Sequence, residues 1–266
     1  MLEQICQQEE GLKRNAFLSN EINFNREIDC FYLLYDKEKL ISFLSLFIPM
    51  QSEAEVSAYT LPELRRKGYF HTLFEKAAQE LKNHGIAKVL FVCEPAGRAA
   101  SEVLKTYGAK LSCSEYRMAY EPGDYRKSGG SLRLEPAARS GLEEMAALDS
   151  RLFDGSYDES LSLLAKSLES GDVKSYCAFL DDRMMGLCSA NFQDGGVTVY
   201  GIGVSPEFQG KGYGREMLNL LLEQILRENP GEISLEVSST NATAYRLYLT
   251  NGFRVKTQYD YYTYSI

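Results

Sequence analysis

The segment Val204–Gly214, with the sequence VSPEFQGKGYG, decides the fold of this chain of 266 residues. It has a counterpart 144 residues earlier, Thr60–Phe70, with the sequence TLPELRRKGYF. Proline, lysine, glycine and tyrosine stand at the same places in both, and the register continues without a gap through the following helix. The apolar positions of both helices have the spacing of one buried face. The repeat therefore predicts that the chain contains two copies of one fold.

Two domains follow from this repeat. We expect a first domain at 1–126 and a second at 131–266, because the stretch from 121 to 130 is rich in turn-forming residues. A chain of this length is sufficient for two domains of ordinary size. A tandem pair can bury the surfaces that a homodimer would use, so we expect a monomer that is an intramolecular pseudo-dimer, or a homodimer.

Each copy predicts the same coarse order of elements, which is clearest in the second. The predicted elements are strands at 132–134, 175–180, 184–192, 197–204 and 233–237, helices at 138–153, 160–168 and 242–250, a long helix from the glycine loop to about 228, and the last strands within 253–264. This order indicates an α/β (or α+β) fold, with a mixed β-sheet flanked by helices in each copy.

The composition is that of a globular protein, with 44% hydrophobic and 25% charged residues. The net charge of -8 disfavours nonspecific binding to nucleic acid, which depends on neutralising phosphates. The longest apolar stretch, Leu40–Met50, is far shorter than the roughly 20 residues of a transmembrane helix. The first residues, Met1–Gln4, lack the pattern of a signal peptide. We therefore expect a cytoplasmic protein with neither nucleic-acid nor membrane partners.

The six cysteines and two histidines are widely separated in the sequence. There is no CxxC pair, and His71 and His84 could not complete a usual zinc set at this spacing. We therefore expect no metal, and we interpret the cysteines as buried, reduced thiols. A Ser–His or Cys–His nucleophile is also disfavoured, because the second copy contains no histidine.

The glycine loop Gln209–Gly214 lies between a predicted strand and a predicted helix. Closely spaced glycines allow a ligand to approach backbone N–H groups, and the N-terminus of the following helix attracts anions. A P-loop would need glycine at Ser205 and a hydroxyl residue at Gly212, and a dinucleotide fingerprint would need glycine at Pro206. The loop therefore predicts a different pyrophosphate site, unless it is only a turn that reverses the chain.

The loop closely resembles the acetyl-CoA loop of the GNAT superfamily of N-acetyltransferases, whose pattern is Q/R-x-x-G-x-G/A after a strand ending in V-x-P. Ile202–Pro206 supplies that strand end. Farther on, Leu235–Phe253 resembles the second motif of the family, N-x-x-A-x-x-L-Y ending in G-F. The resemblance covers the second copy and implies that the chain contains tandem GNAT folds.

This resemblance implies a site for acetyl-CoA as cosubstrate. The backbone amides of Gln209, Gly210, Lys211, Gly212, Tyr213 and Gly214 would hold the pyrophosphate. The strand end Ile202, Gly203 and Val204 would pair with the pantetheine arm, as a peptide adds to a sheet edge. A bulge separates two strands there in the family, and Gly203 is suited to it. Asn241 would contact the cofactor arm.

The resemblance also implies how an acetyl group would pass directly to an amine in a ternary complex. Glu236 stands where the ribosomal-protein N-terminal acetyltransferases have their general base, and it would take the proton of the amine. Tyr248 would protonate the departing thiolate, and the amide at Val204 would meet the oxyanion. The structural alternatives are a solvent-facing or cation-paired strand residue for Glu236, and a half-buried helix tyrosine for Tyr248.

The first copy keeps the positions that shape the backbone, but it differs at the expected site. Val92, Gly97, Leu104 and Phe70 stand in place of Glu236, Asn241, Tyr248 and Gly214. We expect Phe70 to obstruct the approach to the loop. The first copy is therefore interpreted as a degenerate GNAT domain.

The acceptor is open: a small molecule or a peptide with a primary amine. The segment Phe153–Glu159 and the tyrosines between 259 and 264 are candidates to shape its pocket, although a solvated loop and core packing are the plainer interpretations. Two other hypotheses remain. The chain could be a CoA-binding regulatory protein without turnover, and the first copy could be a partner-binding module.

Overall fold

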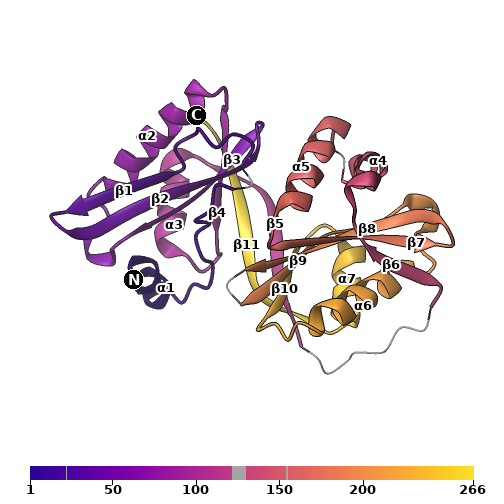
Figure 1. Cartoon of the computed structure of the whole chain (residues 1–266). Coiled ribbons are helices and arrows are strands. Elements are labelled where there is room, and N and C mark those ends of the chain that lie inside the picture. Colours follow the sequence, from indigo (N-terminus) through magenta and orange to yellow (C-terminus); the bar gives the residue numbers. More distant parts are fainter. Residues whose placement is uncertain (22, 122–129, 154, 194) are drawn as a thin grey trace. The chain divides into compact units, whose positions relative to one another are not determined.

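The computed structural model describes all residues except 22, 122–129, 154 and 194. Most of the predicted linker, together with Asp154 and Asp194 of the predicted loops, lies outside the described residues. The chain forms two compact units (Figure 1): Met1–Glu115 with Thr257–Ile266, and Tyr116–Lys256. The predicted domains divide the chain at one place only. In the structure the division also runs through two strands, because residues 116–120 belong to the second unit and residues 257–266 to the first.

The first unit is a mixed sheet with helices. Its elements are α1 (Leu2–Glu10), β1 (Phe31–Asp36), β2 (Lys39–Met50), β3 (Glu53–Thr60), η1 (Pro62–Leu64), α2 (Tyr69–Asn83), β4 (Lys88–Cys93), α3 (Arg98–Tyr107) and the start of β5 (Lys110–Tyr120). The sheet order is β1-β2-β3-β4-β11. The β3–β4 pair is parallel, and the other pairs are antiparallel.

The second unit repeats this arrangement. Its elements are β6 (Leu132–Pro136), η2 (Arg139–Gly141), α4 (Leu142–Leu152), α5 (Tyr157–Glu169), β7 (Val173–Leu180), β8 (Arg183–Gln193), β9 (Gly196–Val204), η3 (Pro206–Phe208), α6 (Tyr213–Leu226), β10 (Ile233–Ser238), α7 (Ala242–Thr250) and the start of β11 (Phe253–Ser265). The sheet order is β5-β10-β9-β8-β7-β6. The predicted fold class, an α/β fold with a mixed sheet in each copy, is confirmed.

The long helices α2 and α6 have matching buried faces, as the repeat predicts. The buried positions in α2 are Leu73, Phe74, Ala77, Ala78 and Leu81, and those in α6 include Met217, Leu218, Leu221, Leu222 and Ile225. Apart from Ala78, each set belongs to the core of its own unit. Full burial of such a side chain stabilises the fold by about 1.5–3 kcal/mol, so these two faces fix both helices on their sheets.

Two expectations about the elements were wrong. Before β1 the first copy has one helix, α1, and over the described residues from 11 to 30 there is neither the strand nor the second helix of the other copy. The last part of the chain is one strand of 13 residues, β11, rather than several. Residues from 257 onward belong to the first unit, where Tyr259 and Tyr261 pack with Leu90 and Val92. These tyrosines therefore take part in core packing, the alternative use.

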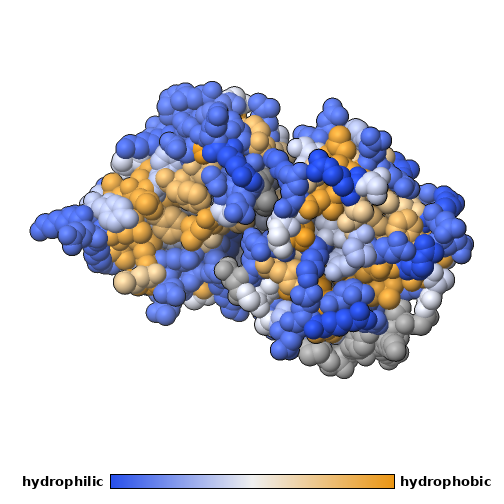
Figure 2. All heavy atoms as spheres, viewed as in Figure 1, coloured by the Kyte–Doolittle hydropathy of each residue, from blue (hydrophilic) through white to orange (hydrophobic). Residues whose placement is uncertain are grey.

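The edge strand β1 carries apolar side chains on its outer face. Phe31, Leu33 and Tyr35 alternate along it and are exposed. Figure 2 shows apolar side chains at the surface over β1 and β2. The periodicity of two residues is that of a strand with one buried face, but both faces of this strand carry hydrophobic residues.

In each unit the two parallel strands pair with each other over three residues only. In the second unit, the pairing of β9 with β10 runs from Val197–Ile233 to Val199–Leu235, although both strands continue beyond it. In the first unit, β3 pairs with β4 up to Val56–Phe91 and also continues. The two strands therefore part in each unit, on the side where the glycine loop follows.

A glycine in β8 fixes the packing beside this opening. Gly186 pairs with Val204, and a Cβ added there would lie 2.8 Å from the Gly203 carbonyl oxygen and 2.9 Å from Met217 Sδ.

We expect Gly186→Ala to lower the unfolding free energy by about 1–3 kcal/mol, the usual effect of overpacking. Gly171→Ala is the control, because a Cβ there has no neighbour within 4 Å, and its effect should stay within about 0.5 kcal/mol. Urea unfolding measures both, and equal stabilities would contradict this packing.

Candidate active site

The glycine loop of the second unit is open on one side. Gly210 and Gly212 have φ of 74° and 89°, values that favour glycine strongly. A Cβ added at either residue would meet no heavy atom within 4 Å. Gly212 is also the N-cap of α6, and as a glycine it has no side chain with which to cap the helix. The first N–H groups of α6 therefore face a space that can admit an anion.

Two side chains hold the loop in this shape. Gln209 Nε2 donates a hydrogen bond to the Val204 carbonyl oxygen at 2.8 Å, and Lys211 Nζ donates to the Glu207 carbonyl oxygen at 2.9 Å. Tyr213, the first residue of α6, lies edge-on to Phe208 with ring centroids 6.3 Å apart. The loop is thus tied to the end of β9 and to the 3-10 turn before it.

The loop also meets α7. A Cβ added at Gly214 would lie 3.7 Å from Leu247 Cδ2 and 3.9 Å from Val204 Cγ2. The structure therefore brings together three of the elements that the sequence connected with one site: the end of β9, the start of α6 and α7.

The predicted bulge is present in β9, but its glycine is Gly201. Between Leu187–Gly203 and Ser189–Tyr200 the pairing of β8 with β9 shifts by one residue, and Gly201 has a φ of 59°. Ile202, inside the bulge, is partly buried against the core. In the first unit, β2 and β3 pair without interruption from Ser42–Thr60 to Phe47–Glu55. The bulge is thus an extra residue of the second copy.

Gly203 was expected to form the bulge, but in the structure it makes room for the end of α4 instead. A Cβ there would lie 2.6 Å from Leu152 Cδ1 and 3.1 Å from Phe153 Cζ. The end of α4 therefore packs directly on the backbone of β9 at Gly203. This contact fixes the strand end between α4 and the loop.

Asn241 and Tyr248 both lie on α7. Asn241 is its N-cap, and Oδ1 accepts a hydrogen bond from the Ala244 N–H at 3.0 Å. Tyr248 is 7% exposed in the core of the second unit, with its ring 5.9 Å from that of Phe253. Burial raises the pKa of Tyr248 to about 12. The hydroxyl is therefore protonated at neutral pH and can act as a proton donor.

Glu236 lies on β10 and is exposed. Its neighbours Leu235 and Val237 point into the core that contains Tyr248. Because side chains alternate along a strand, Glu236 points to the opposite face of the sheet. The candidate proton acceptor and donor therefore lie on the two faces of β10, beside the place where β9 and β10 part.

A hollow of about 490 Å³ borders the same loop, and the sequence reasoning missed it. It is lined by the third residue of α6, Arg215, and by residues of α7 that include Arg246. Both arginines are exposed. The corresponding residues of the first copy are His71 and Glu102. Comparing the charges of the two copies would have singled out these basic positions.

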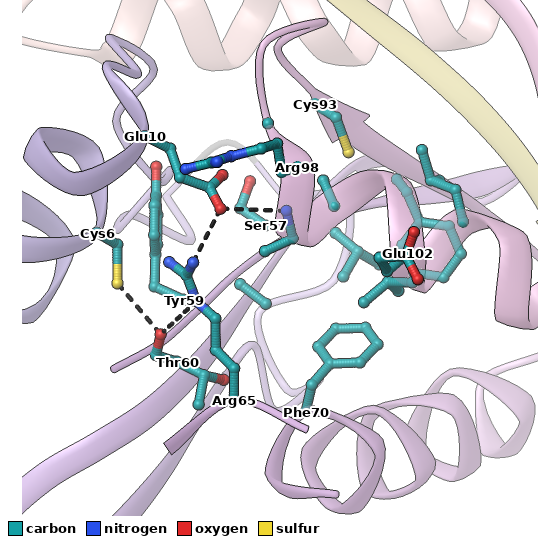
Figure 3. A pocket seen from close by; sticks show the side chains of 18 of the residues that line it. Cys6, Glu10, Ser57, Tyr59, Thr60, Arg65, Phe70, Cys93, Arg98 and Glu102 are labelled. Carbon is teal, nitrogen blue, oxygen red and sulfur yellow. Dashed lines mark hydrogen bonds and ion pairs between the residues drawn. The ribbon is translucent and has the colours of Figure 1, made fainter. Parts of the chain in front are cut away.

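The first unit has its own cavity of about 760 Å³ at the corresponding place (Figure 3). Phe70, which was expected to obstruct the loop, is one of its walls and stacks on Phe74 with ring centroids 5.7 Å apart. The loop backbone is shared, since Arg66 and Gly68 have φ of 66° and 85° where the second copy has Gly210 and Gly212.

Two further observations concern the described residues only. None of their helices is both long and apolar enough to cross a bilayer. They also contain no group of three or more His, Cys, Asp or Glu side chains that could hold a metal ion.

The sequence profile of the Acetyltransferase (GNAT) family matches residues 2–109 and again residues 142–253. The two matches cover most of the chain and fall one in each copy of the repeat. The chain belongs to the GNAT family, and it contains the GNAT domain twice.

Known proteins agree with this assignment. Ribosomal protein bS18-alanine N-acetyltransferase from Salmonella typhimurium strain LT2 is 34% identical over 77 residues, which are 29% of this chain and 52% of that protein. The Escherichia coli K12 protein of the same name is 35% identical over 60 residues, which are 23% of this chain and 40% of that protein. The matched region thus spans about half the length of these relatives or less.

Two solved structures share the whole fold. A GCN5-related N-acetyltransferase from Sphaerobacter thermophilus has a TM-score of 0.79 at 15% identity, covering 99% of this chain and 90% of that chain. A tandem GNAT protein from the clavulanic acid biosynthesis pathway has a TM-score of 0.73 at 14% identity, covering 99% and 93%. The tandem arrangement of two GNAT folds is therefore confirmed.

The capping role of Asn241 can be measured without any ligand. Asn241→Ala removes the acceptor for the Ala244 N–H, so we expect the unfolding free energy to fall by about 1 kcal/mol. Asn241→Asp keeps an acceptor at the same place and should be close to the wild type. Equal loss in both variants, measured by urea unfolding, would contradict the cap.

Proposed function

We propose that the second unit is an acetyl-CoA-dependent N-acetyltransferase, which transfers an acetyl group to a primary amine of a small molecule or peptide in a ternary complex. One observation carries this proposal: an open glycine loop precedes α6 beside the bulged end of β9, where β9 and β10 part. Family membership supports it.

The residues fit the cosubstrate in two respects. The positive φ and the open space at Gly210 and Gly212 suit a pyrophosphate on the amides of Gln209–Gly214. The bulge and the short pairing of β9 leave Ile202, Gly203 and Val204 as a strand end that can pair with the pantetheine arm. Asn241, at the N-terminus of α7, would face that arm. When bound, acetyl-CoA supplies an activated acetyl group.

The chain's own residues would move the protons. Glu236 would accept the proton of the amine, directly or through water, from the exposed face of β10. Tyr248 would donate its proton to the leaving sulfur, because burial keeps its hydroxyl protonated at neutral pH. The amide of Val204 would stabilise the oxyanion, and one such donor contributes roughly 3 kcal/mol. Positioning of the two substrates by β9 and the loop would supply much of the remainder.

The acceptor is proposed only as a class. The curated relatives are named for acetylation of a ribosomal-protein alanine, and the match covers part of each, so a peptide amine is one candidate and a small-molecule amine the other. The absence of nucleic-acid and membrane partners, the cytoplasmic location, and the state of monomer or homodimer stay predictions from the sequence.

A CoA-binding regulatory protein without turnover is the alternative. Release of free thiol from acetyl-CoA, measured against a panel of small amines, peptides and aminoglycosides, distinguishes the two. Amine-dependent release that Gly212→Val abolishes would support the enzyme. Tight binding of CoA with no release across the panel would favour the regulatory protein.

Tyr248→Phe should lower turnover about a hundredfold or more, while affinity for acetyl-CoA changes by less than about twofold. The hydroxyl acts only as sulfur departs, so ground-state binding does not depend on it. Because the pKa of Tyr248 is about 12, its ionisation should cause no alkaline loss of wild-type rate below about pH 11. Unchanged turnover on the accepted amine would remove Tyr248 from the mechanism.

Glu236→Gln should reduce the rate most at low pH, where the amine is most fully protonated. The pH profile of kcat/KM for the wild type and the variant tests this, with Glu232→Gln, four residues earlier and just before β10, as a control. A uniform loss across the profile would indicate a binding or structural role for Glu236.

The whole chain should bind one equivalent of acetyl-CoA, in the second unit. The first copy lacks the bulge, carries Phe70 at the place of Gly214, and has Gly97 and Leu104 in place of Asn241 and Tyr248. Titration calorimetry should show that Gly212→Val removes the heat of binding and that the matched Gly68→Val does not. Two equivalents, or loss of binding through Gly68, would contradict this assignment.

A further inference from the structure

The cavity of the first unit lies entirely among residues of that unit. It is bounded by α1, by the parted strands β3 and β4, and by α2 and α3 (Figure 3). Its volume of about 760 Å³ is within the range of small-molecule sites, about 300–1,000 Å³. The space between the strands has therefore been kept in the copy whose expected catalytic residues are gone.

One wall of this cavity is aromatic. Phe70 of α2, Phe91 of β4 and Tyr107 of α3 line it, with ring centroids 5.8–6.4 Å apart. Leu104, which replaces the tyrosine of the second copy, extends the apolar surface. Such a wall suits an aromatic ring, through edge and face contacts.

Each arginine of the cavity has a carboxylate partner, and Arg65, beside the loop, has two. Arg65 Nε donates to the Thr60 carbonyl oxygen at 3.2 Å, the same bond that Gln209 makes to Val204. The guanidinium of Arg65 then pairs with Glu9 and Glu10, each at 2.8 Å. A phosphate that approaches Arg65 would have to compete with these two carboxylates for it.

Glu10 also occupies the N-terminus of α3. Its side chain is 4% exposed, and Oε1 accepts a hydrogen bond from the Ala99 N–H at 3.1 Å. Gly97, the N-cap of α3, has no side chain to do this, whereas Asn241 caps α7 itself. The carboxylate of Glu10 thus lies where a helix N-terminus and an arginine would otherwise attract an anion.

The second buried carboxylate is also satisfied. Glu94 accepts hydrogen bonds from the backbone N–H groups of Lys13 and Arg14, at 2.5 and 2.6 Å, and from the Thr257 hydroxyl at 2.8 Å. These bonds fix the segment that follows α1 against the cavity. The cavity therefore offers an aromatic wall and charges that are already paired.

We propose that this cavity is a second ligand site, separate from the second unit, which binds an uncharged, mainly aromatic small molecule, and that Glu10 excludes phosphates from it. The selectivity follows from repulsion: a bound phosphate would lie beside the buried carboxylate of Glu10, with Arg65 already engaged. An uncharged ring meets the wall of Phe70, Phe91 and Tyr107 without displacing either group.

Nile red, an uncharged planar dye, tests the site in the full chain. Titration in the presence of saturating CoA, which would fill the second unit, should give one equivalent of saturable fluorescence. Ala100→Phe places a ring in the cavity from α3 and should weaken the dye about tenfold or more. Ala147→Phe adds the same side chain at an exposed position of α4 and should leave the affinity unchanged. Unchanged dye binding in a folded Ala100→Phe protein would overturn the site.

Inorganic pyrophosphate tests the role of Glu10. In the wild type it should shift the apparent dye affinity by less than about twofold, whereas in Glu10→Gln it should compete with the dye. Glu102→Gln, which removes a half-exposed charge from the rim, should behave as the wild type. Competition in the wild type, or none in a folded Glu10→Gln protein, would overturn the selectivity. Failure of the chain to bind CoA would refute the proposed function and leave the Ala100→Phe comparison valid.

Discussion

Parallel pairing between β9 and β10 ends at Val199 and Leu235, and the candidate site depends on that separation. Strands that stayed paired would have no backbone groups to offer at this place. The extra residue in β9 shifts its pairing with β8 by one residue, the Gln209–Val204 hydrogen bond ties the loop to the strand end, and the contact of Leu152 with Gly203 holds that end in position. Local backbone geometry, more than any single reactive side chain, thus defines where a cosubstrate can lie.

The two units share one backbone arrangement but differ in the charged side chains beside it. The separation of the strands, the positive φ before each long helix, and the side-chain bond from Arg65 or Gln209 are common to both. The difference lies in what faces the frame. The second unit has Arg215 and Arg246 where the first has His71 and Glu102, and the first also has Glu10 against Arg65 and α3. In the first unit a carboxylate of the protein itself therefore lies beside Arg65, next to an aromatic wall.

Much of this could be predicted from the sequence, because it is written in short-range patterns. The repeat register, the helix faces and the positive-φ glycine at Gly212 are local features, and the structure agrees with them. The extra residue at Gly201 was missed, because the two copies were aligned from residue 204 onward and that alignment has no gap. The contact of Glu10 with Arg65, 55 residues apart, and the exchange of strand ends are long-range and leave no local pattern. The roles of Glu236 and Tyr248 stay predictions.

The path of β11 has a consequence for biosynthesis. Asp260–Ser265 pairs with β4, and Tyr259 and Tyr261 cover Leu90 and Val92, so the sheet of the first unit is incomplete until Thr257–Ile266 has been translated. At about 5–20 residues per second, the ribosome needs on the order of ten seconds to proceed from Glu115 to this segment. During that interval one edge of β4 is unpaired and its apolar side chains are uncovered. The sheet of the first unit can therefore be completed only after the second unit has been translated.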